Sequence, residues 1–286
     1  MGNSNGLIQI RRDTCFNIIP CPIRHRIMFA AYNTLPTVDI ADEHAERLSS
    51  VRQKLSNLLQ EYQLQNVFGI RLVHKHFDML EGELPVFSRI PVTGVTPVII
   101  MRPLPSSNLS QYTPKNFLVH HENLIPYEFS TSTSRIDISQ YQHFIDRVVK
   151  VITEENANHI FGLVAFPDED SDDALSEFEL PELRTTVMVP PSLLPSAGTT
   201  KEIPTNWKAP HGYSPTATVA AYCGSRSDKH VKVSGYCQFR QTFGHTRVSP
   251  IGPEGTPSND SEIILQPGSL IARVVVEVQS CVAVAG

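Results

Sequence analysis

Apolar residues recur at steps of three and four between positions 41 and 64, and this spacing predicts an amphipathic helix with one buried face. The apolar stripe consists of Leu48, Val51, Leu55, Leu58, Leu59 and Tyr62. The run over 67–77 (VFGIRLVHKHF) predicts a strand. A turn at 81–83 (EGE) should return the chain as a partner strand over 84–90, so that residues 41–90 form a helix–strand–hairpin unit.

A second stretch of the chain has a similar pattern. An apolar stripe predicts a helix over 139–156, with Ser139 and Gln142 as a capping box. A strand over 159–166 should follow, and then an acidic turn and an extended segment over 183–189.

The two stretches share a short sequence as well as a pattern. The letters IFGL at 160–163 match VFGI at 67–70, at an offset of 93 residues, the separation of Phe68 and Phe161. We therefore expect two similar helix–strand–hairpin units, at about 41–90 and 139–189, related by internal duplication.

The chain changes character after residue 189. Residues 190–204 are rich in Pro, Ser, Gly and Thr, which predicts a linker. Beyond it, β-branched and alternating runs predict strands over 216–223, 230–239 and 269–285 and indicate no helix. The expected fold class is α+β, with an α+β region over 1–189 and a β-rich C-terminal third over 205–286 packed on it.

Composition and charge narrow the classes of partner and cofactor. Of the 286 residues, 41% are apolar and 19% charged, and the net charge of −5 predicts neither nucleic-acid nor membrane binding. The five cysteines are too sparse for a disulfide framework, so we expect reduced thiols and a cytoplasmic location. A phosphate-binding loop and a dinucleotide fingerprint are both missing, which predicts no nucleotide cofactor. Nothing indicates an oligomeric state.

His74 and His76 are the leading candidates for chemistry. Alternate residues of a strand point to the same face, so both imidazoles should emerge together and could bind one divalent metal, Zn or Fe. Asp78 and Glu81 lie close by in sequence, and we expect one of them as third ligand or general base. The competing interpretation is that the two histidines only hydrogen-bond across a hairpin.

Two other groups contain metal-binding residue types. His120, His121 and Glu122 form one, although adjacent residues of an extended segment face opposite ways, which favours a polar loop. Cys223, His230, Cys237 and His245 form the other, and a zinc site there lacks the usual closely spaced cysteine pair.

Several of these residues resemble a known group of proteins. The segment Leu72-Val73-His74-Lys75-His76-Phe77, followed by an acidic hairpin, is similar to the Leu-x-His-Arg-His-Phe motif of a filamentous-fungal family with no assigned activity. PYEF at 126–129 and FGL at 161–163 resemble later landmarks of that family, and the likeness covers about residues 60 to 190. The resemblance implies a fungal source and no particular chemistry. Lys75 stands where the family usually has Arg, a change that matters if this side chain binds an anion.

Three functions are consistent with these features. The first is a metal-dependent enzyme acting on a small molecule through His74 and His76. The second is a non-catalytic scaffold whose duplicated units form a groove for a ligand or a protein. The third is an interaction module stabilised by zinc at the C-terminal Cys/His set.

Overall fold

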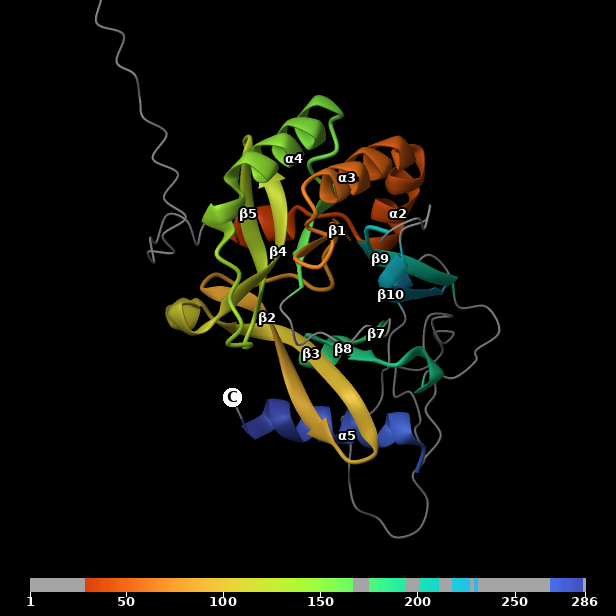
Figure 1. The fold of residues 1–286 in the computed structure, drawn as a ribbon. Coiled ribbons are helices and arrows are strands. Elements are labelled where there is room, and N and C mark those ends of the chain that lie inside the picture. Colours follow the sequence, from red (N-terminus) through yellow and green to blue (C-terminus); the bar gives the residue numbers. More distant parts are fainter. Residues whose placement is uncertain are drawn as a thin grey trace, which may run out of the picture.

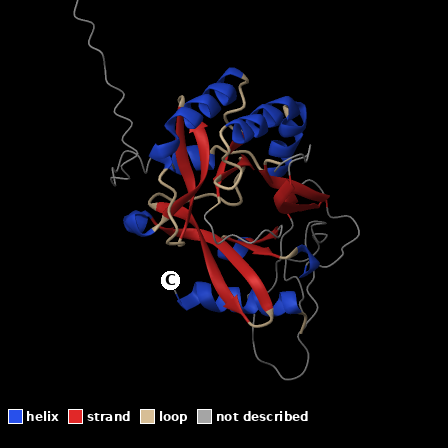
Figure 2. Cartoon of the chain, in the orientation of Figure 1, coloured by secondary structure: helices blue, strands red, loops and turns tan. Residues whose placement is uncertain are grey.

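The computed structural model describes residues 29–166, 175–193, 201–210, 218–226, 229–230 and 268–284. These residues form one large curled sheet with helices against its outer face (Figures 1 and 2), which confirms the α+β class. Within these ranges, no helix combines the length and the apolar character needed to span a membrane.

The first predicted helix is divided into two. They are α2 (Val38–Arg47) and α3 (Ser49–Glu61), and they meet at Leu48, whose φ of −106° and ψ of 27° are not helical. The chain therefore changes direction within the predicted 41–64 segment. The predicted stripe is nevertheless buried along α3, through Val51, Leu55, Leu58 and Leu59.

The second predicted helix is confirmed as α4 (Gln142–Glu154), preceded by a short 3₁₀ helix, η2 (Ile138–Tyr141). The predicted capping box at Ser139 does not form. Instead the Asp137 carboxylate accepts a hydrogen bond from the Ser139 amide at 3.1 Å. The buried side of α4 joins that of α3 in one apolar core, because both helices lie on the same part of the sheet (Figure 1).

Eleven strands occur in the described residues, and ten of them close into a ring. The order around the ring is β10, β7, β8, β3, β2, β5, β4, β6, β1 and β9, and β9 pairs back onto β10. The strands are β1 (Phe68–Leu72), β2 (Glu83–Val92), β3 (Val95–Pro105), β4 (Thr113–His120), β5 (Asn123–Ser130), β6 (Phe161–Ala165), β7 (Leu175–Leu180), β8 (Thr185–Val189), β9 (Lys201–Lys208), β10 (Thr218–Arg226) and β11 (Lys229–His230). Three further 3₁₀ helices are η1 (Ser106–Gln111), η3 (Pro181–Leu183) and η4 (Pro191–Leu193).

The predicted hairpins are wrong. β1 ends at Leu72 and pairs with β6 and β9, whereas β2 pairs with β3 and β5. Residues 73–82 therefore leave the sheet instead of turning back along β1. β9 begins at Lys201, inside the stretch expected to be a linker.

The C-terminal segment differs from its prediction. Residues 269–285 were expected to form a strand, but the structure has a helix there, α5 (Leu270–Val284). Its buried residues Ile271, Val274, Val275 and Val278 follow the spacing of a helix and pack on β2, β3, β7 and β8. In Figure 1, α5 lies on the side of the ring opposite to α3 and α4.

The two halves of the ring agree in detail. Adding 93 to the bounds of α3 gives those of α4, and adding 93 to the bounds of β1 gives those of β6. After each helix one residue adopts the left-handed conformation, Gln63 and Asn156, both with φ of 55°. The same offset relates the hydrogen bonds Leu64 N to Leu59 O and Ala157 N to Ile152 O.

Strand pairing follows the same relation around the whole ring. The antiparallel pairs β1–β9, β9–β10 and β7–β8 correspond to β6–β4, β4–β5 and β2–β3, and the parallel pair β7–β10 corresponds to β2–β5. In each of the two remaining pairs, β1–β6 and β3–β8, the two strands correspond to each other. The ring therefore has an approximate two-fold axis that runs through these two pairs.

Candidate metal centre

A group of charged side chains is buried inside the ring. It consists of Arg71 on β1, Glu128 on β5 and Glu177 and Glu179 on β7, together with His74 and His76 just after β1. None of β1, β5 and β7 pairs with another of these three strands. Their side chains therefore meet across the interior, because alternate residues of each strand face inward.

Arg71 connects three strands to β1. Its guanidinium lies 3.4 Å from Glu128 and 3.9 Å from Glu177, and it donates to Asn206 Oδ1 at 3.2 Å and to the Tyr127 hydroxyl at 3.3 Å. Among the described residues, Arg71 is the one lysine or arginine in the buried set. Its neighbours Ile70 and Leu72 face the apolar layer under the helices. Because side chains alternate along a strand, Arg71 points the other way, into the ring.

The segment 73–82 carries the two histidines. The Lys75 amide donates to Pro36 O at 3.0 Å, and the Asn33 side chain makes hydrogen bonds to both backbone groups of Met79. Arg184 donates to Glu83 at 2.9 and 2.6 Å and to the Asp78 carbonyl. Hydrogen bonds from distant parts of the chain therefore hold this segment in place, and they take the role that hydrogen bonds between paired strands have in the sheet.

The two imidazoles lie side by side although they are not on a strand. Their ring centroids are 4.7 Å apart. His74 Nδ1 lies 2.8 Å from the Leu72 carbonyl. A carbonyl only accepts hydrogen bonds, so Nδ1 carries a proton and the lone pair of a neutral His74 is on Nε2.

His76 lies between two carboxylates of β7. Its Nε2 is 3.3 Å from Glu177 Oε2, and its Nδ1 is 3.5 Å from Glu179 Oε1. The His76 side chain is only 1% exposed. Burial lowers the pKa of His76 to about 4; Arg71 adds to the decrease and Glu177 opposes it. The ring is therefore neutral at pH 7.

His74, His76 and Glu177 form a group that could hold a metal ion. One ligand atom from each lies within 4.8 Å of the others. Two imidazole nitrogens and one carboxylate oxygen are a donor set that Zn²⁺ and Fe²⁺ both accept. The sequence prediction that both histidines belong to one site agrees with this geometry.

The charge balance of the interior also favours a cation. Three buried glutamates face one buried arginine, and both histidines can be neutral. Burial raises the pKa of Glu128, and Arg71 and the Asn116 amide, which donates to it, oppose that rise. Unbalanced negative charge in a dry interior is costly, so protons or a bound cation must compensate for it.

The other two predicted site residues lie elsewhere. Asp78 has a side chain that is 75% exposed and pairs with Lys75 Nζ at 2.7 Å. Glu81 is also exposed, in the turn before β2. Neither Asp78 nor Glu81, expected as third ligand or general base, belongs to the buried group, because segment 73–82 leaves the sheet and both side chains are exposed.

Sequence reasoning missed Glu177 and Glu179. They alternate with the buried Phe178 on β7, a pattern that ordinarily indicates a solvated strand face. Only the closed ring turns that face inward, and the ring includes pairings between strands far apart in sequence, such as β1 with β6 and β3 with β8.

Among the described residues, His120, His121 and Glu122 do not form a group that could hold a metal ion. His120 and His121 lie edge to face, with ring centroids 4.1 Å apart, at a partly exposed turn between β4 and β5. Their rings meet because His121 and Glu122 have positive φ, so the segment is a tight turn and not extended. Cys237 and His245 lie outside the described residues, and the proposed zinc set stays a prediction.

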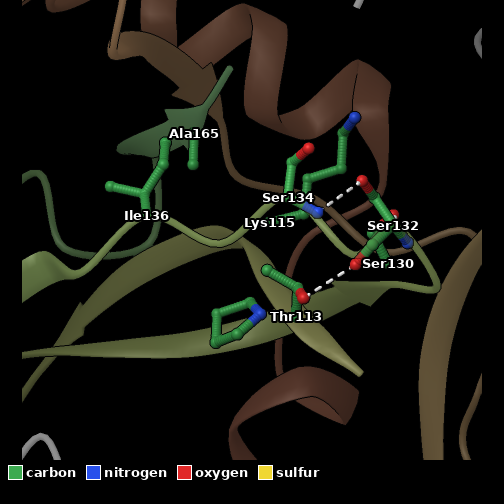
Figure 3. A pocket seen from close by; sticks show the side chains of 8 residues that line it. Thr113, Lys115, Ser130, Ser132, Ser134, Ile136 and Ala165 are labelled. Atoms are coloured by element: carbon green, nitrogen blue, oxygen red, sulfur yellow. Dashed lines mark hydrogen bonds between the residues drawn. The ribbon is translucent and has the colours of Figure 1, made fainter. Parts of the chain in front are cut away.

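A small pocket lies away from the histidines. It is lined by Thr113, Lys115, Ser130, Ser132 and Ser134, with Pro114, Ile136 and Ala165 completing it (Figure 3). Its volume is about 10 Å³, room for roughly one water molecule. Thr113 Oγ1 already donates to the Ser132 carbonyl at 2.8 Å. The pocket is too small to receive a substrate.

No protein-family model, curated protein or solved structure matches this chain. The geometry of the interior group is therefore the guide to the function of the protein.

Proposed function

We propose that this protein is a metal-dependent enzyme that acts on a small molecule, with the ion held by His74, His76 and Glu177. The observation that carries the proposal is the convergence of three donor atoms within 4.8 Å of one another inside the ring. Three protein ligands are the usual number at a catalytic zinc, because the fourth position is then left to water or substrate.

The distances are close to those of a metal site. Ligand atoms about 2.0–2.1 Å from a tetrahedral ion are roughly 3.3 Å from each other. His76 Nε2 and Glu177 Oε2 already have that separation, 3.3 Å. The separations within the group reach up to 4.8 Å, so a shift of about 1.5 Å would bring the widest pair to that value. A bound ion would activate a water molecule as a nucleophile or polarise a carbonyl group, and Glu179 is the nearby carboxylate that could accept a proton.

Access to the site depends on the segment 73–82. The three proposed ligands are buried, and segment 73–82 carries two of them, so a movement of this segment would open the site to a substrate. The contacts that hold it, from Asn33 and Arg184, are side-chain hydrogen bonds at partly buried positions. Such contacts open more readily than a buried ladder of strand hydrogen bonds.

A second candidate function is supported by the same burial. Structural zinc sites are closed, and the ion there serves folding instead of chemistry. A metal enclosed by His74, His76 and Glu177 would then neutralise the excess of carboxylates and hold β1 and β7 together.

Metal analysis of the full-length protein tests the proposal. After equilibration with zinc or iron(II) and removal of free metal, we expect one ion per chain in the wild type. The double variant His74→Ala/His76→Ala and the variant Glu177→Gln should lose it, whereas His120→Ala/His121→Ala should keep it. A wild type that retains neither metal, or a double variant that retains one, rules the proposal out and leaves the scaffold function.

Cobalt(II) substitution separates the enzyme from the closed structural site. An open coordination position binds a small anion such as azide, which changes the visible spectrum of the cobalt protein. We expect that change. A spectrum that does not respond to azide supports the structural role.

We also propose that the two halves, about 49–130 and 142–226, arose by internal duplication. Gly69 and Gly162 support this, because each prevents an equivalent overlap. A Cβ on Gly69 would meet the carbonyl oxygen of Trp207 and the side chain of Phe166, and one on Gly162 would meet the carbonyl oxygen of Phe117 and the side chain of Val73. Val73 and Phe166 are themselves 93 residues apart.

The strands beside β1 and β6 add a matching motif. β4 contains Pro114, Asn116 and Phe117, and β9 has proline, asparagine and an aromatic residue at the same relative positions (PTNW at 204–207). Asn116 pairs with Val164 on β6, and Asn206 pairs with Arg71 on β1, the residue 93 positions earlier. The similarity therefore extends to β4 and β9, which lie outside the two units, about 41–90 and 139–189, in which the sequence predicted it.

A further inference from the structure

We propose that Glu179 is a positioning residue that holds the proton of His76 on Nδ1, so that both histidines offer Nε2 to the metal. This inference rests on the proposed metal site, and it names a residue that is not itself a ligand. The observations that carry it are the two contacts of the His76 ring and the matching contact of His74.

The His76 ring is placed between two carboxylates of one strand. Glu177 and Glu179 are two residues apart on β7, so both face the interior, and one is near each ring nitrogen. A neutral imidazole has a single N–H, and it can donate to only one of the two. The tautomer of His76 therefore decides which glutamate is the hydrogen-bond acceptor and which nitrogen carries the lone pair.

Two arrangements are open to the ring. If Nε2 carries the proton, Glu177 Oε2 is the carboxylate oxygen near it, and no lone pair points toward the proposed ion. If Nδ1 carries it, Glu179 Oε1 lies 3.5 Å from that nitrogen, and Nε2, which then has the lone pair, lies 3.3 Å from Glu177 Oε2. Two lone pairs at that separation repel each other unless a cation lies between them, which is the geometry of two ligands on one ion.

His74 has the same arrangement with a different partner. Its Nδ1 proton goes to the Leu72 carbonyl at 2.8 Å, which leaves Nε2 as the ligand atom. Metal-binding histidines usually donate their second N–H to a carbonyl or a carboxylate in this way, and losing that partner weakens metal affinity about 10- to 100-fold. Leu72 O and Glu179 would therefore act as equivalent partners for the two rings.

The decisive variants are Glu179→Leu, which removes the acceptor, and Glu179→Gln, which keeps an oxygen but removes the charge. Glu182→Gln is the matched control, because Glu182 is exposed in η3, three residues further along. Zinc affinity is measured by competition with a chromophoric chelator. We expect Glu179→Leu to bind one ion with affinity about 10- to 100-fold lower, Glu179→Gln to lie between it and the wild type, and Glu182→Gln to be unchanged.

Nitrogen-15 NMR of the histidine rings in the metal-free proteins reports the tautomer directly. We expect His76 to carry its proton on Nδ1 in the wild type and to lose that preference in Glu179→Leu, while His74 stays unchanged in both. Thermal unfolding confirms that the variants fold, so that a change in affinity is not a loss of structure.

The two proposals fail in different ways. A wild type that binds no metal refutes the proposed function, and the NMR result then decides the role of Glu179 by itself. Wild-type affinity in Glu179→Leu, or a proton on Nε2 of His76 in the wild type, overturns the role of Glu179 and leaves the metal site intact.

Discussion

Ile70 and Leu163 pair directly with each other across β1 and β6, and each occupies the position of the other at the offset of 93 residues. The approximate two-fold axis passes through this pair. The candidate metal centre does not obey that symmetry, because its histidines come from the first half of the ring and its carboxylate, Glu177, comes from the second. Glu177 pairs with Met188 on β8. Met188 corresponds to Met101 on β3, and Met101 pairs with Phe87. One half therefore has a carboxylate where the other has an aromatic ring, and a single site results.

Exchange of the equivalent helix ends tests the duplication. We expect that replacing residues 62–67 by the sequence of 155–160 leaves the protein folded, because both connections use the same hydrogen bonds and the same left-handed residue. The free energy of unfolding, measured with urea, should fall by less than about 2 kcal/mol. As a control, Gln63→Val should be costly, since β-branched residues disfavour positive φ. An exchanged protein that does not fold would count against equivalence of the two halves.

The glycine in β6 should be indispensable. In Gly162→Ala the new methyl group overlaps the Phe117 carbonyl, which belongs to a paired neighbouring strand and cannot move aside. We expect a loss of more than about 3 kcal/mol, or no folded protein. Gly82→Ala is the comparison, because Gly82 has φ of 85° with nothing near its Cβ position, and left-handed strain there costs about 1–2 kcal/mol. Equal losses in the two variants, measured by thermal unfolding, would contradict the close approach of β4 and β6.

Arg71 should be essential for stability even without metal. Arg71→Leu leaves Glu128 and Glu177 buried without their cation, and we expect the free energy of unfolding to fall by about 3–5 kcal/mol. The double variant Arg71→Leu/Glu128→Leu should lose less than the sum of its single changes, because it removes one of the uncompensated charges. Arg147→Leu breaks an exposed pair with Glu61 and should cost about 1 kcal/mol or less. Additive losses would show that Arg71 and Glu128 do not interact.

The helical structure of α5 gives a test that a strand would fail. Val274 and Val275 are both buried, although adjacent strand residues on a half-exposed sheet face opposite ways. We expect Val274→Asp and Val275→Asp each to destabilise the protein by several kcal/mol, because each places a charge against the apolar face of β3 and β8. The exposed Glu277 serves as the control, and Glu277→Gln should change stability by less than about 0.5 kcal/mol. Tolerance of either aspartate would contradict the packing of α5.

The sequence predicted the parts of the fold that are determined by residues close together in the chain. The stripes of α3 and α4 follow from helical period, and the start of β1 follows from β-branched and aromatic residues next to Gly69. The partner of β1 could not be deduced, since β6 lies more than eighty residues away and no local turn joins the two strands. The run Val274-Val275-Val276 indicated a strand because β-branched residues favour sheets, but burial of one helical face outweighed that preference.

For the candidate site, too, the sequence predicted the residues that are close together in the chain and missed the distant one. His74 and His76 were expected to share one site, and their rings do lie next to each other, although the reason given, strand alternation, does not apply after Leu72. The third donor was sought among sequence neighbours, Asp78 and Glu81, because nothing in the sequence linked the histidines to a strand a hundred residues later. Glu177 reaches them only through the closure of the ring.

That closure has a consequence for the order of events during synthesis. β10 supplies the contacts that join β9 to β7, so the ring stays open until residue 226 has left the ribosome. Before then, Arg71 and the glutamates of β7 remain hydrated, and β7 and β9 each have an unsatisfied edge where other growing chains can attach. A polypeptide truncated between β8 and β10 should therefore form an open, aggregation-prone sheet with its interior charges in contact with water. Completion of β9 and β10 removes these charges from water and covers the open edges.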